Sequence, residues 1–338
     1  MIGDSYLSAG KLELEFLKQL LETYHCTDES VVVGPGIGND AAVIDIGDSY
    51  LIAKSDPITF VSQDIGFYAV NINANDIACM GGVPRWFLVT ILLPEKYTTQ
   101  SQVKDIFQQI SAACTQLKIA LCGGHTEVTH GISRPIIAGQ MLGTASKERL
   151  IQPKNVQIGD DVLLTKGIAI EATSIVAREK SIELIDLFSS EFVERCQNFI
   201  KKPGISVLND AQIALQSGAV HAMHDPTEGG LAMGLYELAN AANAGITIEL
   251  DKIPMLAEAK LLCDQYGLDI LGVIASGALL IIAPHHAAQV IINELGKNRI
   301  PAASIGKITS KRPGVTLKMG KEEMEMPIFQ KDEIIKIF

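Results

Sequence analysis

The clearest periodic pattern in the chain covers residues 100–118, where apolar residues recur at i, i+3, i+4 and i+7 and predict an amphipathic helix. A weaker apolar stripe from Leu14 to Tyr24 predicts a helix over 11–25. Short apolar runs bounded by Gly, Pro and polar residues predict strands. The first half is therefore expected to contain strands at 31–33, 41–46, 50–56, 85–93, 119–122 and 135–144 and a further helix at 64–80.

The periodicity lapses around residues 152–155, and a new series of strands and helices follows. This lapse predicts two domains, 1–152 and 153–338, and a length of 338 residues suits two domains. A short similarity between 46–54 and 158–166, each a Gly-Asp turn followed by an apolar run that ends in lysine, suggests related halves. The second half is expected to contain strands at 161–165 and 219–223, helices at 170–180, 190–200, 205–217 and 226–243, and short alternating elements from 246 onward.

Composition narrows the class of protein. Hydrophobic residues make up 47% of the chain, enough for a sizeable core, so the alternation of strands and helices predicts a folded α+β or α/β protein. A formal charge of −11 disfavours nucleic-acid binding. No apolar run is long enough to cross a membrane, and the first residues lack the features of a signal peptide, so we expect a cytoplasmic protein. Six cysteines without a CxxC pair favour reduced thiols and argue against zinc.

The first candidate site is the glycine-rich segment from Gly34 to Val43. Closely spaced glycines let backbone N–H groups approach an anion, although an ordinary turn is the alternative and no P-loop lysine follows. The residues of interest are Gly36, Gly38, Asn39 and Asp40.

The second candidate lies where an apolar strand ends in Lys54-Ser-Asp-Pro-Ile-Thr59. Asp56 has the position of a ligand at the carboxyl end of a strand, and a Ser-Asp-Pro turn is the alternative.

A polar group interrupts the helix predicted at 64–80. Residues 71–78 read Asn-Ile-Asn-Ala-Asn-Asp-Ile-Ala, which runs against helix propensity. No Lys or Glu of a solvated face accompanies them. We therefore expect a functional polar cluster that includes Asn75 and Asp76.

Two further segments combine glycine pairs with polar residues. Gly123 and Gly124 precede His125 and Glu127, which either bind a ligand or belong to an ordinary loop. In the second segment, Asp225, Pro226 and Glu228 have the spacing of a capping box that opens the helix predicted at 226–243. Capping does not explain Gly229 and Gly230, which cost helix stability but allow another group to approach closely.

Three carboxylates, Asp40, Asp56 and Asp76, thus lie at separate turns or helix faces of the first half. Carboxylates without a set of thiols or histidines suit a hard cation, most simply Mg²⁺. Because an acidic site holds a polyphosphate only with cations between them, the sequence predicts a nucleotide bound together with Mg²⁺.

Five motifs in this order resemble the AIR synthetase-like ATP-binding superfamily, which includes aminoimidazole ribonucleotide synthetase, thiamine-monophosphate kinase, selenophosphate synthetase and the hydrogenase-maturation factor HypE. The resemblance covers about residues 10 to 310 and is strongest to HypE. The motifs are Gly36-Ile-Gly-Asn-Asp-Ala-Ala42, Ser55-Asp56, Asn75-Asp-Ile-Ala-Cys-Met-Gly-Gly82, Asp225-Pro-Thr-Glu-Gly-Gly-Leu-Ala232 and Ala275-Ser-Gly-Ala-Leu279.

The resemblance implies a two-domain α+β fold in which first-half strands of two subunits form a shared β-barrel and the C-terminal domain is an α/β sandwich. It also implies a homodimer with ATP in a cleft beside the barrel, and ATP-driven activation of an oxygen, sulfur, selenium or phosphate centre. By this resemblance, Asp40, Asp56 and Asp76 hold Mg²⁺, and Gly36 and Gly38 lie against the nucleotide. The polar segments themselves make Asp76, His125 and Glu127 the catalytic candidates. The nucleotide-binding candidates are Gly36, Gly38, Asn39, Lys54, Asn75, Gly123, Gly124, Asp225, Gly229 and Gly230.

The sequence departs from the family pattern at three places. Asn39 and His125 stand where the family has aspartates, and no cysteine follows Cys263, whereas HypE works through a C-terminal cysteine. We therefore expect an ATP-dependent enzyme that does not use HypE's cysteine chemistry. The alternatives are a nucleotide-binding maturation or scaffold protein without turnover and a thiamine-monophosphate-type kinase.

Overall fold

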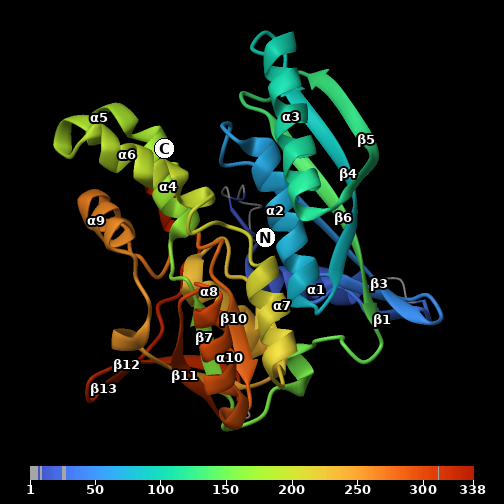
Figure 1. The fold of residues 1–338 in the computed structure, drawn as a ribbon, viewed down its shortest axis with the longest axis vertical. Coiled ribbons are helices and arrows are strands. Elements are labelled where there is room, and N and C mark those ends of the chain that lie inside the picture. Colours follow the sequence, from blue (N-terminus) through green and yellow to red (C-terminus); the bar gives the residue numbers. More distant parts are fainter. Residues whose placement is uncertain (1–6, 8–9, 25–27, 311) are drawn as a thin grey trace, which may run out of the picture.

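The computed structural model describes residues 7, 10–24, 28–310 and 312–338, and it contains two sheets that each carry helices (Figure 1). The first sheet has the strand order β1-β2-β3-β6-β4-β5, with antiparallel neighbours except for β4 and β5. The elements of this half are α1 (Leu14–Thr23), β1 (Val31–Val33), β2 (Ala42–Asp45), β3 (Ser49–Ile58), α2 (Ile65–Cys79), β4 (Val83–Pro94), α3 (Gln100–Leu117), β5 (Ala120–Thr129) and β6 (Ile136–Ser146).

The second sheet has the strand order β13-β12-β9-β11-β7-β10-β8, and its neighbours are antiparallel except for β12 and β9. Its strands are β7 (Asp161–Thr165), β8 (Ala222–His224), β9 (Gly245–Glu249), β10 (Leu280–Ala283), β11 (Ala302–Ser310), β12 (Gly314–Met319) and β13 (Glu322–Glu325). The helices of this half are α4 (Ile170–Glu179), α5 (Ser181–Leu187), α6 (Ser190–Gln197), α7 (Leu208–Ser217), α8 (Gly230–Ala242), α9 (Ala257–Tyr266) and α10 (His285–Lys297), with short 3-10 turns at 153–155, 198–200, 250–252 and 333–337.

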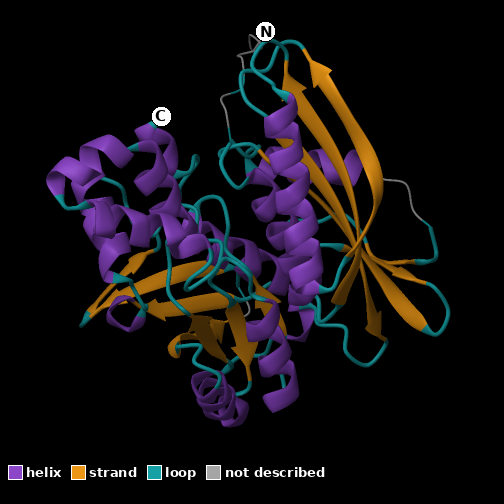
Figure 2. Cartoon of the chain, turned by 45° about the horizontal axis from the view of Figure 1, so that its top comes forward, coloured by secondary structure: helices purple, strands orange, loops and turns teal. Residues whose placement is uncertain are grey.

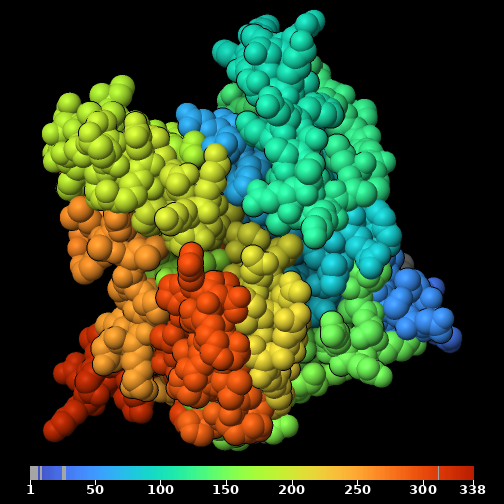
Figure 3. All heavy atoms as spheres, in the orientation of Figure 1, coloured from blue at the N-terminus to red at the C-terminus, as the bar shows by residue number. Residues whose placement is uncertain are grey.

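Helices α2 and α3 cover one face of the six-stranded sheet (Figure 2). All residues of α2 except Phe67 are buried, because the helix lies between the sheet on one side and α3 and α7 on the other. Figure 3 shows α7, in yellow, between the first-half helices and α10. The polar residues of α2 are therefore inside the molecule.

Most predicted elements are present, and the α+β expectation is confirmed. The segment that follows the strand predicted at 119–122 was interpreted wrongly, because β5 continues through the glycine pair to Thr129. A Cβ atom at Gly124 would lie 1.8 Å from the carbonyl oxygen of Val89, so glycine is what lets β5 pair with β4 here. The two glycines thus serve strand pairing.

The start of the helix predicted at 226–243 was also placed wrongly. Helix α8 begins at Gly230, with Gly229 in the left-handed region at φ 82°, so Asp225 does not cap it. The backbone N–H of Gly229 donates instead to the Asp332 carboxylate at 2.7 Å. A Cβ atom at Gly230 would lie 2.4 Å from the carbonyl oxygen of Leu271, so the group that approaches this glycine closely is another backbone segment.

The arrangement of these elements does not test the expected barrel or the expected domain boundary. In the part of the chain that the structure describes, no pairing joins the edge strands β1 and β5, and a barrel shared between two subunits stays a prediction. The boundary near residue 152 also stays a prediction. No helix in the described ranges is long and apolar enough to cross a membrane. Cys26 lies outside the described residues, and the other five cysteines are free thiols.

Candidate functional site

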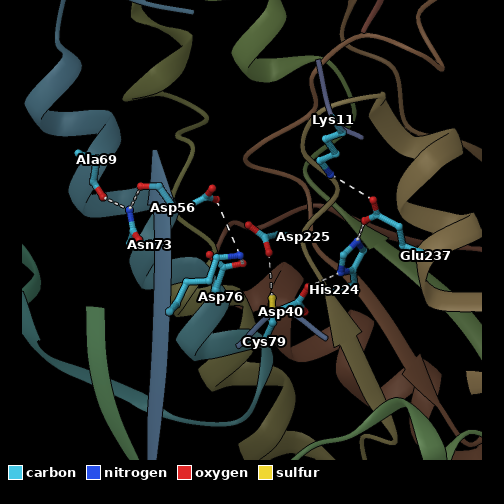
Figure 4. A network of polar contacts seen from close by, with 11 residues as sticks. Lys11, Asp40, Asp56, Ala69, Asn73, Asp76, Cys79, His224, Asp225 and Glu237 are labelled. Carbon is cyan, nitrogen blue, oxygen red and sulfur yellow. Dashed lines mark hydrogen bonds and ion pairs between the residues drawn. The ribbon is translucent and has the colours of Figure 1, made fainter. Parts of the chain in front are cut away.

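A cluster of carboxylates surrounds one lysine where the two halves of the chain meet (Figure 4). Lys54 and Asp56 lie on β3, and Asp76 lies in the last turn of α2. The Lys54 ammonium lies 3.2 Å from Asp76 Oδ1 and 3.9 Å from Asp56 Oδ2. Asp76 is buried, whereas the side chains of Asp56 and Lys54 are partly exposed. The exposed side of the cluster is therefore formed by Lys54 and Asp56.

A chain of charged groups extends from Asp40 to the N-terminal segment. Asp40 Oδ1 lies 2.7 Å from Nδ1 of His224, the last residue of β8. His224 Nε2 lies 3.3 Å from Glu237 Oε2 on α8, and Lys11 donates to Glu237 Oε1 at 3.1 Å. Burial lowers the pKa of His224, but Asp40 and Glu237 outweigh that effect and raise it well above its usual value. The contacts with Asp40 and Glu237 therefore favour the charged form of the imidazole in this position.

The thiol of Cys79 also belongs to this cluster. Cys79 ends α2, one helical turn after Asp76, and its Sγ donates to Asp225 Oδ1 at 3.4 Å. Burial and the charge of Asp225 raise the pKa of this thiol well above its usual range. The sequence interpretation missed both Cys79 and His224. The i, i+3 spacing from Asp76 to Cys79 is the signal that could have revealed the thiol.

Negative charge exceeds positive charge in this buried region. Burial raises the pKa of Asp76 well above its usual range, Lys54 opposes the shift, and Asp225 and Asp40 add to it. Burial and Asp40 raise the pKa of Asp225 to about 7 against the opposing charges of His224 and Lys54. The Oδ2 atoms of Asp76 and Asp225 are buried without a hydrogen-bond partner. Buried carboxylates in this state fit a bound cation, because such a ligand would supply the missing partner.

The asparagines of α2 have structural partners. The Asn75 amide donates to Ile205 O at 2.9 Å and its oxygen accepts from Val207 N at 2.9 Å, so it joins α2 to the second half. Asn73 donates to the carbonyl oxygens of Ala69 and Asp56, at 2.9 Å and 3.2 Å. Of the polar residues of α2 expected to act in the site, the structure directs Asp76 toward Lys54 and uses Asn75 and Asn73 to hold the backbone.

The glycine-rich segment forms a turn against α8. Asn39 closes this turn, with its amide 3.2 Å from Gly34 O. A Cβ atom at Gly38 would lie 2.5 Å from the carbonyl oxygen of Glu237, so this glycine allows the turn to contact α8. Gly36 lines a cavity of about 650 Å³ between the turn, α1 and the end of α8. The turn thereby fixes Asp40, which follows it directly.

His125 and Glu127 lie elsewhere in the subunit. They form an exposed pair on β5, with His125 Nε2 3.1 Å from Glu127 Oε2. Strands β6 and β4 separate β5 from β3, a distance of roughly 14 Å at the usual strand spacing. Within one chain, the structure does not bring these two residues together with Asp76.

The donor set near Lys54 fits a phosphate group bound with Mg²⁺. Carboxylate oxygens are the ligands that Mg²⁺ prefers, and Asp76 offers a buried oxygen without a partner. The Lys54 ammonium offers a charged donor for an anionic oxygen in the same place.

Both halves of the chain match known protein families. The family model described as AIR synthase related protein, N-terminal domain, matches residues 38–145, and the one described as AIR synthase related protein, C-terminal domain, matches residues 157–318. A hydrogenase expression/formation protein of Methanocaldococcus jannaschii is 30% identical over 335 residues, which cover 95% of each chain. Carbamoyl dehydratase HypE of Escherichia coli is 28% identical over 282 residues, 80% of this chain and 76% of that protein.

Among solved structures, the hydrogenase maturation protein HypE in complex with ATP is similar, with a TM-score of 0.72 at 20% identity. The similarity covers 94% of this chain and 96% of that chain, so both sheets share the fold.

Proposed function

The chain belongs to the AIR synthase related family, and from this membership and the carboxylate cluster we propose that it is an ATP-dependent enzyme that cleaves or transfers a phosphate of ATP. The observation that carries the proposal is the buried, partnerless oxygen of Asp76 beside the Lys54 ammonium. The names of the similar proteins support hydrogenase maturation as the process served. The acceptor would be an oxygen-, sulfur-, selenium- or phosphate-containing group.

Each residue would have a distinct task in this reaction. Asp56 and Asp76 would hold Mg²⁺, which neutralises charge on the phosphate oxygens. Lys54 would donate to a phosphate oxygen and exchange part of its contact with Asp76 for it. His224 would keep Asp40 in place through the 2.7 Å contact.

Calorimetric titration of ATP with and without Mg²⁺, on the wild type and on Lys54→Met, tests this function. We expect Mg²⁺-dependent binding in the wild type and binding about 10- to 100-fold weaker in the variant, because a charge-assisted hydrogen bond contributes about 1.5–3 kcal/mol. Lys147→Met is the control, since Lys147 forms an exposed pair with Asp45 at 2.8 Å.

Phosphate release, followed in parallel, separates the alternatives. Release on addition of ATP supports the enzyme. Tight binding without release would overturn turnover and favour a nucleotide-binding scaffold, and transfer to thiamine monophosphate would identify a kinase. Absence of ATP binding would overturn the nucleotide function as a whole.

We also propose that the chain acts as a homodimer through β5. Residues 120–128 of this edge strand are exposed on both faces, including the apolar side chains of Leu121 and Val128. Such an edge is a ready surface for another strand. Pairing across the dimer would let His125 and Glu127 reach the acceptor bound to the second subunit. Within their own subunit, these two residues have no such route.

The dimer predicts a solution mass of twice the 36.4 kDa of one chain. Val128→Asp should shift the mass toward that of one chain, because it places a charge in the contact between subunits. Ile182→Asp on α5, which is also exposed but distant from β5, should leave the mass unchanged. Light scattering coupled to size exclusion measures both, and a wild-type mass of 36.4 kDa would contradict the dimer.

A further inference from the structure

A polar cavity lies between the two halves of the chain, on the side of α2 that faces α3. It has a volume of about 560 Å³ and is lined by α2, α3, the loop 200–206 and the start of α7. The other side of α2 packs on the six-stranded sheet, where Asp76 meets Lys54. The cavity is therefore separate from the site assigned to the nucleotide, and its volume is in the usual range for a small-molecule site.

The similarity between the two halves of the sequence ends at this cavity. In the first half, the similar segment ends in Lys54, which lies 3.2 Å from Asp76 of α2. In the second half it ends in Lys166, directly after β7, which lies 3.3 Å from Asp210 in the first turn of α7. Both Lys166 and Asp210 line the cavity. The second half thus repeats the pairing of a lysine with an aspartate of a later helix, at a place that the proposed ATP reaction does not use.

Lys166 can donate to a ligand in addition to its present partners. In the described structure its ammonium donates to Ser206 O at 2.7 Å and to Asp210 Oδ2 at 3.4 Å, and an ammonium carries three protons. The side chains of Lys166 and Asp210 are only 5% and 3% exposed. Burial lowers the pKa of Lys166, and the charge of Asp210 opposes this shift. An anionic oxygen in the cavity would accept the third proton and favour the charged lysine.

The charges around the cavity favour an anionic ligand. Each of the two aspartates that line it already has a cationic partner, because Asp210 pairs with Lys166 and Asp64 lies 2.8 Å from Arg178 Nη2. Lys201 also lines the cavity, and it has no ion-pair partner among the described residues. A lysine without a partner attracts an anion, even in a chain whose formal charge is −11.

Amide side chains supply most of the remaining polar surface. Asn71 of α2 is 3% exposed and donates to Phe67 O at 2.9 Å, and three further amides line the cavity, those of Gln109, Gln116 and Asn209. Because a side-chain amide both donates and accepts hydrogen bonds, it suits the hydroxyl groups of a ligand. Phe67, the one residue of α2 that is not buried, adds an apolar surface to the same cavity.

We propose that this cavity binds a small organic anion that carries hydroxyl groups, with a sugar phosphate as its representative. Lys166 and Lys201 bind the anionic group, since lysine is a common ligand of phosphate, and the amide side chains bind the hydroxyl groups. The proposal does not rest on ATP binding, because the cavity and the cluster around Lys54 lie on different sides of α2.

Calorimetric titration of the full chain with glucose 6-phosphate, without ATP or Mg²⁺, tests this site. We expect one equivalent to bind and Lys201→Met to weaken binding about 10- to 100-fold, because the variant loses a charge-assisted hydrogen bond. Lys202→Met is the matched control, since Lys202 is the exposed neighbour that does not line the cavity. Ala112→Trp should also block binding. Ala112 is an exposed residue of α3 that lines the cavity, so a larger side chain fills the site without disturbing the core.

Two further probes identify the group that is recognised. Gluconate carries a carboxylate in place of the phosphate, so its affinity relative to glucose 6-phosphate shows which anion the site prefers. Glucose should bind at least about tenfold more weakly than the preferred anion, since it lacks the charge that the lysines bind.

The proposal is wrong if neither anion binds, if glucose binds as tightly as the anions, or if binding survives both Lys201→Met and Ala112→Trp. Binding that is lost in Lys54→Met but retained in Lys201→Met would place the anion in the nucleotide site and overturn the proposal as well. Because ATP is absent throughout, a negative result leaves the nucleotide function standing, and failure of ATP binding leaves this result standing.

Discussion

Asp76→Asn is expected to lower the rate of ATP-dependent phosphate release about 10²- to 10³-fold, the usual cost of removing one charged group that acts on a developing charge. Asparagine retains an oxygen that can accept from Lys54, which lies 3.2 Å from Asp76 Oδ1, so the variant should fold. It loses the buried, partnerless carboxylate oxygen that we assign to Mg²⁺. The measurement is phosphate release at saturating ATP over a range of Mg²⁺ concentrations.

The same variant should gain stability in the absence of ligand at pH values above the ordinary pKa of an aspartate. Burial raises the pKa of Asp76, with Lys54 in opposition and Asp225 and Asp40 adding to the rise, so its ionised form opposes folding as pH increases. Asp105→Asn, an exposed replacement of the same kind on α3, should change neither activity nor stability. Unchanged phosphate release in Asp76→Asn would contradict the role of this carboxylate, whatever its effect on stability.

The spacing of apolar residues was sufficient to predict the elements that are buried on one side only. Helix α3 follows the predicted 100–118 pattern because one face packs on α2 and the other is solvated. The pattern failed at β5, where the glycines that were interpreted as a loop allow close pairing with β4. It failed again at the start of α8, since the carboxylate that satisfies the Gly229 N–H comes from Asp332, about a hundred residues away.

The acidic residues of the candidate site could be predicted from the sequence. The residues that contact them could not. Asp56 and Asp76 lie in short polar interruptions of apolar segments, a local signal that sequence contains. His224 and Asp40 meet only because the second sheet carries β8 up to the glycine-rich turn, which no local pattern reports. The asparagines of α2 correctly indicated that this face of the helix is buried. They did not indicate a role in catalysis or binding, because Asn75 forms hydrogen bonds with backbone groups of the other half.

Glu171→Gln is expected to stabilise the protein by about 3 kcal/mol at pH 8 and by little at pH 4, because a pKa shift costs about 1.4 kcal/mol per unit. Glu171 lies in the first turn of α4, and its Oε2 atom is buried without a partner. Burial is the main cause that raises its pKa from 4.5 to about 7, while Ser276 opposes the shift and Asp332 adds to it. A glutamine amide has nearly the same shape as the carboxyl group but carries no charge that burial would oppose.

The sign of this effect follows from proton linkage. The folded state holds a proton on Glu171 up to about pH 7, whereas the unfolded chain releases it near 4.5, so the wild type loses stability as pH rises between these values. Urea denaturation at pH 4, 6 and 8 should therefore show curves for wild type and variant that coincide at pH 4 and separate progressively above it. Glu179→Gln, an exposed replacement at the end of the same helix, should follow the wild type at every pH. An equal difference between wild type and Glu171→Gln at all three pH values would show that packing of the amide, and not the buried charge, determines the stability of this helix start.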